Sequence, residues 1–181
     1  MKMETERLTL RPMIREDFAA LHAILSDPQT MLHYPKPFDE AHTRAWIEKN
    51  MNNEAELGFS LWAVVLRETG KCIGDCGISL QNIHGKIRPE IGYHIHRDHQ
   101  RREYASEAAK AWLDFAFEHT PFNAVYSYMK YTNAASYGVA LKNGMQFIEE
   151  YDDPVNTRTR VYAMTRAQWQ TMRAEKRCAD D

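Results

Sequence analysis

Residues 97–107 combine positive charge with the expected start of a helix, and this is where the sequence could bind an anion. Arg101 and Arg102 lie in the connector between a strand and a long helix. Unpaired N–H groups at a helix N-terminus, together with the helix dipole, bind phosphate oxygens. The connector therefore predicts a diphosphate site. The alternative is a solvated basic loop that caps the helix with its own side chains.

Three histidines just before and within this connector raise a second possibility, a metal site. His94 and His96 share a strand face, and His99 follows closely. Three imidazoles can hold zinc. However, strand residues two apart lie ~7 Å apart, and Cys72 and Cys76 show no ligand spacing. We therefore predict no metal, and expect one of these histidines to line a binding pocket as a base or hydrogen-bond donor.

The elements that must position these residues alternate between strand-like and helix-like patterns. Strands are expected from alternating or continuous apolar runs at 8–10, 59–66, 72–80, 89–96, 125–131, 147–151 and 158–164. Helices are expected at 15–25, from Asp39 to Met51 with fraying at Asn52–Asn53, at 105–116, at 134–143 with Gly144 as its cap, and as a polar terminal helix or tail at 167–176. Hairpins come first and a strand-helix-strand-helix unit follows. The pattern predicts an α/β (α+β) fold with a mixed, mostly antiparallel central sheet and helices on both faces.

Composition sets limits on what the chain can be. It has 181 residues, 44% of them apolar, and a formal net charge of -2. This size predicts a single domain over residues 1–181. The near-neutral charge argues against a nucleic-acid binder, and no apolar run approaches the ~20 residues of a membrane span. Three cysteines and the absence of an apolar leader pattern predict a reducing compartment, the cytoplasm.

Two stretches together resemble the GNAT N-acetyltransferases. Gln100, Ala105 and Ser106 match the family's loop after a strand, and Asn133, Ser136 and Gly144 match its later motif in order and spacing. The opening Glu4 to Pro12 is similar to that of the ribosomal-protein N-terminal acetyltransferase (RimJ/RimL-like) branch. The resemblance covers nearly the whole chain. It implies a GNAT-like fold and transfer of an acetyl group from acetyl-CoA to a primary amine, on a peptide N-terminus or a small molecule.

The resemblance also implies site residues. Coenzyme contacts are expected at His94, Ile95, His96, Gln100, Arg101, Arg102, Glu103, Tyr104, Ala105, Ser106 and Asn133. Glu90, at the start of the central strand, stands where the family has a general base. A desolvated carboxylate there would have a raised pKa and could take the proton of an ammonium directly or through water. A main-chain N–H near Ile95 would polarise the acetyl carbonyl. The alternative for Glu90 is a surface carboxylate at a strand end.

The sequence departs from the family at two places. Glu103 stands where the loop usually has Gly, and Arg101 where it often has a small residue; Gly tolerates positive φ that other residues resist. Ala140 stands where a Tyr often protonates the leaving thiolate. Ser136, one helical turn earlier, is the expected acid instead, unless it bonds to a carbonyl of its own helix. Tyr137 is expected to be a packing aromatic.

These departures leave a second function open. A non-catalytic acetyl-CoA-binding module or sensor would keep the fold without the proton-handling groups. The amine acceptor is expected to contact the helix around Trp46 and the loops near Tyr34 and Tyr151. The expected partners are acetyl-CoA and this amine, without nucleic acid or membrane, in a monomer or a homodimer. An exposed strand edge at 158–164 could pair with a second copy.

Overall fold

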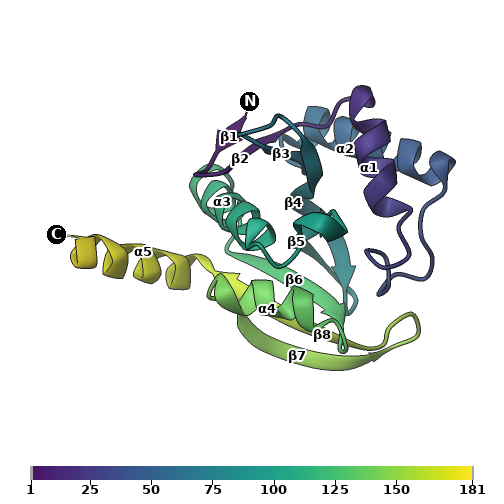
Figure 1. Cartoon of the computed structure of the whole chain (residues 1–181). Coiled ribbons are helices and arrows are strands. Elements are labelled where there is room, and N and C mark those ends of the chain that lie inside the picture. The colour runs from purple at the N-terminus through teal and green to yellow at the C-terminus, as the bar shows by residue number, and fades with distance from the viewer. Residues whose placement is uncertain (1, 181) are drawn as a thin grey trace. The chain divides into compact units, whose positions relative to one another are not determined.

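The computed structural model describes residues 2–180, and within them eight strands and five α-helices form an α/β fold with a mixed, mostly antiparallel sheet, as expected from the sequence (Figure 1). The strands are β1 (Met3–Glu4), β2 (Leu8–Arg11), β3 (Leu61–Leu66), β4 (Cys72–Ile83), β5 (Lys86–Ile95), β6 (Ala124–Lys130), β7 (Gln146–Asp153) and β8 (Thr157–Thr165). The helices are α1 (Phe18–Leu25), α2 (Glu40–Leu57), α3 (Tyr104–His119), α4 (Ala134–Lys142) and α5 (Arg166–Asp180), with short 3-10 helices η1 (Arg15–Asp17) and η2 (Arg97–His99). The chain falls into two compact units, residues 1–79 with 91–112 and residues 80–90 with 113–181. The single domain expected over residues 1–181 stays a prediction.

In the first unit the strands lie in the order β1-β2-β3-β4-β5. β1, β2, β3 and β4 pair antiparallel, with Leu10 opposite Val64 and Leu61 opposite Gly77. The first four residues of β3 are buried one after another, as the continuous apolar run predicts for a strand covered on both faces. α1 and α2 lie side by side (Figure 1). One apolar core cluster of this unit consists of Met13, Leu21, Ile24, Leu25, Met31, Ile47 and Leu61.

Helix α2 begins as predicted and ends later than predicted. The Asp39 side chain accepts the N–H of His42, which caps the helix. The expected fraying at Asn52–Asn53 is wrong, because α2 continues to Leu57. Glu54 in this last stretch accepts the indole N–H of Trp62 at 2.6 Å. This tertiary contact stabilises the last turns of α2, which the helix propensities of their residues alone would not.

Gly74 lets β4 approach β5 closely. A Cβ atom on Gly74 would lie 2.1 Å from the carbonyl oxygen of His94 and 2.9 Å from the Ile95 side chain. The first of these neighbours is backbone, which cannot rotate away. The approach of the two strands beside His94 therefore requires glycine at this position.

We predict that Gly74→Ala lowers the free energy of unfolding by about 2 kcal/mol, the usual range for overpacking a tight contact. Denaturant unfolding measures it. Gly138→Ala is the matched control: nothing lies within 4 Å of its added Cβ, and it lies inside α4, where Ala is the better helix former. The control should leave stability unchanged or raise it. Equal loss in both variants would contradict the close-approach argument.

In the second unit the strands lie in the order β4-β5-β6-β8-β7. β5 and β6 are parallel, with Glu90 opposite Tyr126, and β8 pairs antiparallel with both β6 and β7. The expected exposed edge at 158–164 is therefore wrong: β8 is an interior strand, and β7 occupies the edge. The alternation of β8 looked like an edge strand. It forms a hairpin with β7, which precedes it directly, but its other neighbour, β6, is separated from it in the sequence by α4 and β7.

The polar C-terminal segment is a helix rather than a tail. Arg166, the first residue of α5, donates to the carbonyls of Phe117, Thr120 and Phe122, which lie at and just after the end of α3. The Phe117 carbonyl lies in the last turn of α3, where carbonyls have no partner within the helix. The indole of Trp169 donates to Asp114 at 2.7 Å. Because these contacts lie within the second unit, they explain why a polar sequence folds as α5.

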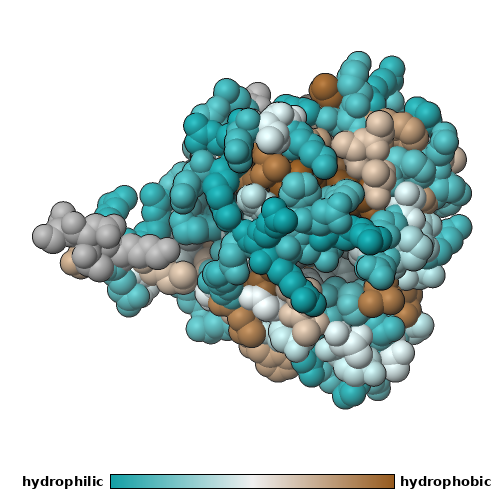
Figure 2. Space-filling view, in the orientation of Figure 1, coloured by the Kyte–Doolittle hydropathy of each residue, from teal (hydrophilic) through white to brown (hydrophobic). Residues whose placement is uncertain are grey.

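Hydrophilic side chains cover most of the face seen in Figure 2, and hydrophobic ones gather in a few small areas. Exposed large apolar residues lie apart in the chain: Leu32 between α1 and α2, Ile87 on β5, and Val155 in the turn between β7 and β8. Within residues 2–180, none of the helices is both long and apolar enough to span a bilayer.

Candidate functional site: the loop before α3 and the strands beside it

The connector between β5 and α3 adopts a backbone conformation that its residue types disfavour. Arg101 has φ 57° and Glu103 has φ 69°, both in the left-handed region that favours glycine. A side chain in this region costs roughly 1 kcal/mol or more. Strained conformations of this kind persist where surrounding contacts over-determine them, and they gather at ligand sites. Arg101, Arg102 and Glu103 are all exposed, and α3 begins at the next residue, Tyr104.

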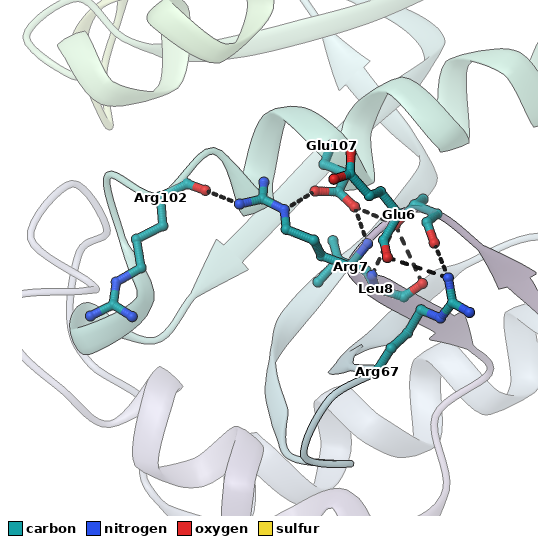
Figure 3. A network of polar contacts seen from close by, with 7 residues as sticks. Glu6, Arg7, Leu8, Arg67, Arg102 and Glu107 are labelled. Atoms are coloured by element: carbon teal, nitrogen blue, oxygen red, sulfur yellow. Dashed lines mark hydrogen bonds and ion pairs between the residues drawn. The ribbon is translucent and has the colours of Figure 1, made fainter.

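A network of polar contacts holds this loop to the beginning of the chain (Figure 3). Glu107, in the first turn of α3, accepts the hydroxyl of Thr5 at 2.5 Å. It also accepts the main-chain N–H and the guanidinium of Arg7, at 2.8 Å and 2.7 Å. The same guanidinium donates to the carbonyl of Arg102 at 3.0 Å and lies over the Tyr104 ring. Arg7 thus links the loop to the helix that follows it.

The main-chain groups of β5 point to alternate edges of the strand. The N–H of His96 donates to Ile73 of β4 at 2.8 Å, and the N–H of His94 donates to Asp75 of the same strand. Since successive residues turn their N–H groups to opposite edges, the Ile95 N–H points away from β4. The Gln100 side chain donates to the Ile95 carbonyl at 2.9 Å and so connects the loop to the end of β5.

His99 presents a buried nitrogen to the loop. Among the described residues, its Nδ1 atom is buried and makes no hydrogen bond. Burial, with the positive charges of Lys71, His96 and Arg102, lowers the pKa of His99 below its ordinary value of 6.5. Buried polar atoms are normally satisfied, so this nitrogen fits a polar ligand group.

His94 does not join the other two histidines around a common centre. Its Nδ1 lies 2.7 Å from Oδ1 of Asp75, and its Nε2 lies 2.7 Å from the hydroxyl of Tyr34. The other oxygen of Asp75 accepts the indole N–H of Trp46 at 2.9 Å. Within residues 2–180 no group of three or more His, Cys, Asp or Glu side chains is placed to hold a metal ion.

Glu90 lies on β5 within the second unit, opposite Tyr126 of β6, and only 8% of it is exposed. Burial, followed by the negative charge of Glu90, raises the pKa of Tyr128 to about 12. The Tyr128 phenol therefore keeps its proton at neutral pH and remains a neutral neighbour of the Glu90 carboxylate. This buried position differs from the surface carboxylate that was the alternative for Glu90.

The second motif forms the start of α4. Asn133 caps the helix, because its side-chain oxygen accepts the N–H of Ser136 at 3.2 Å. Ser136 is half-buried, and Ala140 one turn later is buried. Tyr137 stacks on Tyr162, as expected of a packing aromatic.

The structure therefore divides the predicted site residues between the two units. His94, Ile95, His96 and the loop 100–106 lie in the first, and Glu90, Asn133 and Ser136 lie in the second. Sequence reasoning did not single out Thr5, Arg7, Glu107 or Asp75. One signal was available for the last of these: Asp75 is a charged residue inside an otherwise apolar strand, and it is fully buried.

We predict that Glu103→Gly raises the free energy of unfolding by about 0.5 kcal/mol, because glycine removes the Cβ strain at positive φ but adds entropy to the unfolded chain. Thermal and denaturant unfolding measure the change. Glu103→Ala is the control, since it removes the charge and keeps the Cβ. An equal gain in the alanine variant would show that charge, and not backbone strain, limits stability here.

We also predict a pH-dependent effect of Glu107→Gln. Burial raises the pKa of Glu107, but the hydrogen bonds from Thr5 and Arg7 together outweigh it and hold the pKa below the ordinary 4.5. When the pKa of a carboxylate is lower in the folded state than in the unfolded state, the carboxylate stabilises the protein at pH values above its unfolded-state pKa. This stabilisation is lost as the pH falls through the folded-state pKa. The free energy of unfolding of the wild-type protein should exceed that of the variant by about 1 kcal/mol at pH 7, and the difference should shrink below pH 4.5.

The measurement for Glu107→Gln is denaturant unfolding from pH 3 to 8. Glu56→Gln, at an exposed position of α2, serves as the control for the loss of one carboxylate charge. A gap between wild type and Glu107→Gln that grows as the solution is acidified would contradict the proposed anchoring of the loop.

Comparison with known proteins assigns the fold to a family. A family model described as an acetyltransferase (GNAT) domain matches residues 7–146. The uncharacterized protein YkkB of Bacillus subtilis (strain 168) is 37% identical over 158 residues, which cover 85% of this chain and 92% of that protein. The uncharacterized N-acetyltransferase YnaD of the same bacterium is 31% identical over 147 residues, 81% of this chain and 83% of that protein.

Solved structures of acetyltransferases also match this chain. A GNAT-family acetyltransferase from Bacillus anthracis has a TM-score of 0.80 at 26% identity, and the match covers 92% of this chain and 99% of that chain. RimL, a ribosomal alpha-N-protein acetyltransferase solved in complex with coenzyme A, shares the fold with a TM-score of 0.76 at 16% identity, over 91% of this chain and 98% of that chain. Since the matched domain spans most of its length, this chain belongs to the GNAT family of acetyltransferases.

Proposed function

We propose that this protein transfers the acetyl group of acetyl-CoA to a primary amine, at a peptide N-terminus or on a small molecule, by direct attack of the amine on the thioester. The observation that carries the proposal is the loop at 97–106. It holds two non-glycine residues at positive φ, leads into the N-terminus of α3, and is fixed by Arg7 and Glu107. A loop maintained in a strained shape by contacts from a distant segment indicates a binding role.

The residues of this loop fit a diphosphate. The first N–H groups of α3 are unpaired by helix geometry and carry the positive end of the helix dipole. Arg101 and Arg102 add two exposed positive charges, against one negative charge at Glu103. The partnerless Nδ1 of His99 offers a further polar contact. We propose coenzyme contacts at His96, at Gln100 to Ser106 and at Asn133.

The chemistry requires a neutral amine and a polarised carbonyl. An α-amino group has a pKa of ~8 and a lysine amine ~10.4, so a proton must leave before attack at neutral pH. We propose that the buried Glu90 carboxylate takes this proton. The outward-pointing N–H of Ile95 would donate to the acetyl oxygen, an interaction worth roughly 3 kcal/mol in a pre-organised site. Ser136 or water would return a proton to the sulfur.

A specific observation also supports the alternative, a non-catalytic acetyl-CoA-binding module. Ala140 is buried and carries no hydroxyl at the place where relatives in the family often have a tyrosine. Such a module would bind the coenzyme with similar affinity but release no thiol. The same loop geometry supports coenzyme binding in both functions, so only turnover separates them.

Calorimetry with coenzyme A tests the binding step, and a mass-spectrometric screen of amines with acetyl-CoA, including peptides that differ in their first residue, tests the transfer step. Binding with acetylated product supports the transferase. Binding without product on any amine supports the binding module. The absence of saturation at millimolar coenzyme A would overturn both.

We predict that Glu90→Gln lowers kcat by about 100-fold, the usual range for loss of a general base, and that the loss is largest at low pH. At higher pH more of the amine is already neutral, so the base matters less. The measurement is the pH profile of thiol release, with coenzyme A binding within two-fold of wild type as the folding control. An unchanged profile would remove Glu90 from this role.

The finer features of the proposal come from the composition and the sequence resemblance. The peptide N-terminus is included among the acceptors because the segment from Glu4 to Pro12 is similar to that of the ribosomal-protein branch. The near-neutral charge and the three cysteines favour a cytoplasmic protein that acts without nucleic acid or membrane, as a monomer or a homodimer.

A further inference from the structure

Two adjacent residues of β4 hold the main-chain groups of His94. The N–H of His94 donates to Oδ1 of Asp75 at 3.2 Å. The carbonyl oxygen of His94 lies so close to Gly74 that a Cβ atom added to the glycine would be 2.1 Å from it. All three residues belong to the first unit, as does the loop at 97–106. The backbone of His94 is therefore fixed at its donor and at its acceptor within one compact body.

The Asp75 carboxylate takes the place that a main-chain carbonyl has in a regular ladder. Its Oδ1 atom also lies 2.7 Å from Nδ1 of the His94 ring, and because a carboxylate can only accept, this nitrogen is the donor. One oxygen thus holds both the backbone and the side chain of His94. The other oxygen accepts the indole N–H of Trp46 at 2.9 Å. Three donors satisfy a carboxylate that is 0% exposed.

A β-bulge on β4 comes directly before these two residues. The pairing of β3 with β4 shifts between Val64 and Val65, which leaves Ile73 as an extra residue on β4. Bulges bend a strand and redirect the side chains next to them, and they are frequent beside active sites. Gly74 and Asp75 follow Ile73 in the sequence. The irregularity of β4 is therefore located where this strand contacts His94.

The direction of the His94 carbonyl determines the direction of the next N–H. The peptide bond between His94 and Ile95 is planar and trans, so its C=O and its N–H point in opposite directions. Because the carbonyl faces Gly74 on β4, the Ile95 N–H faces the other edge of β5. The Ile95 carbonyl faces this edge too, and the Gln100 side chain donates to it at 2.9 Å. The N–H of Ile95 and the loop before α3 therefore meet at the same edge of one strand.

We propose that Asp75 is a positioning residue for acetyl transfer: it fixes the peptide between His94 and Ile95 so that the Ile95 N–H points at the acetyl oxygen. The inference rests on the proposed function, in which this N–H polarises the thioester carbonyl. A donor that is oriented in advance stabilises the negative charge that develops on this oxygen. Rotation of the peptide would weaken the hydrogen bond, because its strength falls as the angle departs from linear. Asp75 itself acts only through the backbone of His94.

Infrared spectroscopy of bound acetyl-CoA, isotope-labelled at its acetyl carbonyl, tests the inference. A hydrogen bond to the oxygen lowers the stretching frequency, so the wild-type protein should shift the carbonyl band below that of free acetyl-CoA. Asp75→Asn keeps the size of the side chain and removes its charge. The shift should shrink by about half or more in this variant, because charge-assisted hydrogen bonds are roughly twice as strong as neutral ones. Affinity for coenzyme A, which lacks the acetyl group, should stay within two-fold of wild type.

Asp17→Asn is the matched control. Asp17 is also a buried carboxylate of the first unit that receives three hydrogen bonds, two from the guanidinium of Arg11 and one from the main-chain N–H of Ile14. Its three donors lie outside β5. The control should lose stability but keep the wild-type carbonyl band. With an amine that wild type acetylates, kcat should fall by about 10-fold or more in Asp75→Asn and stay within two-fold of wild type in Asp17→Asn.

A second variant and a second measurement cover the case in which Asp75→Asn folds poorly. The new amide group would place its own N–H atoms opposite the indole N–H of Trp46. Asp75→Asn/Trp46→Phe removes that conflict, and the same reduced band shift is expected. In amide NMR, exchanging coenzyme A for acetyl-CoA should move the Ile95 N–H resonance in wild type and in Asp17→Asn, and should move it less in both Asp75 variants.

The outcomes distinguish this inference from the proposed function. A full carbonyl shift in both Asp75 variants, or an equal reduction in Asp17→Asn, would overturn the positioning role and leave coenzyme binding intact. If wild type binds acetyl-CoA without a band shift and without a change at the Ile95 resonance, this N–H is not the donor and the inference fails. Absence of any coenzyme binding by wild type would overturn the proposed function as well.

Discussion

The Glu107 carboxylate is the contact on which the loop before α3 depends. It accepts from Thr5 and twice from Arg7, and Arg7 extends the network to the carbonyl of Arg102. Without such anchors the left-handed backbone at Arg101 and Glu103 would be expected to relax, since each of these residues disfavours it. The opening of the chain therefore has a structural role: Thr5 and Arg7 shape a loop far along the sequence. The other arginine, Arg11, pairs with Asp17 through both of its terminal nitrogens.

A second buried carboxylate, Asp75, organises the strand that follows. Three N–H groups converge on it, from His94 twice and from Trp46 once. Gly74, next to it in sequence, allows β4 and β5 to approach closely enough for these bonds to form. Adjacent residues thus have linked roles: Gly74 allows the short distance between β4 and β5, and at this distance Asp75 orients the His94 imidazole.

Much of the fold follows from the sequence because apolar periodicity and capping residues are local signals. Asp39 begins α2, and Gly144 at φ 83° follows the end of α4, as their residue types predict. The C-terminal end of α2 and the interior position of β8 depend on partners elsewhere in the chain, Trp62 for one and β6 for the other. The same holds for the site. Residue types and motif spacing indicate the loop, whereas the pairing of Asp75 with His94 and of Arg7 with Glu107 arises only when distant segments meet.

The contact between Arg7 and Glu107 also affects the order in which parts of this protein fold. Arg7 and Glu107 are separated by 100 positions, so their ion pair closes a very long loop of chain. Contacts of this kind form late, because the entropy of loop closure must be overcome before they contribute. During synthesis Arg7 leaves the ribosome well before Glu107 does. The loop before α3 is therefore expected to reach its final shape near the end of folding, after α3 has emerged.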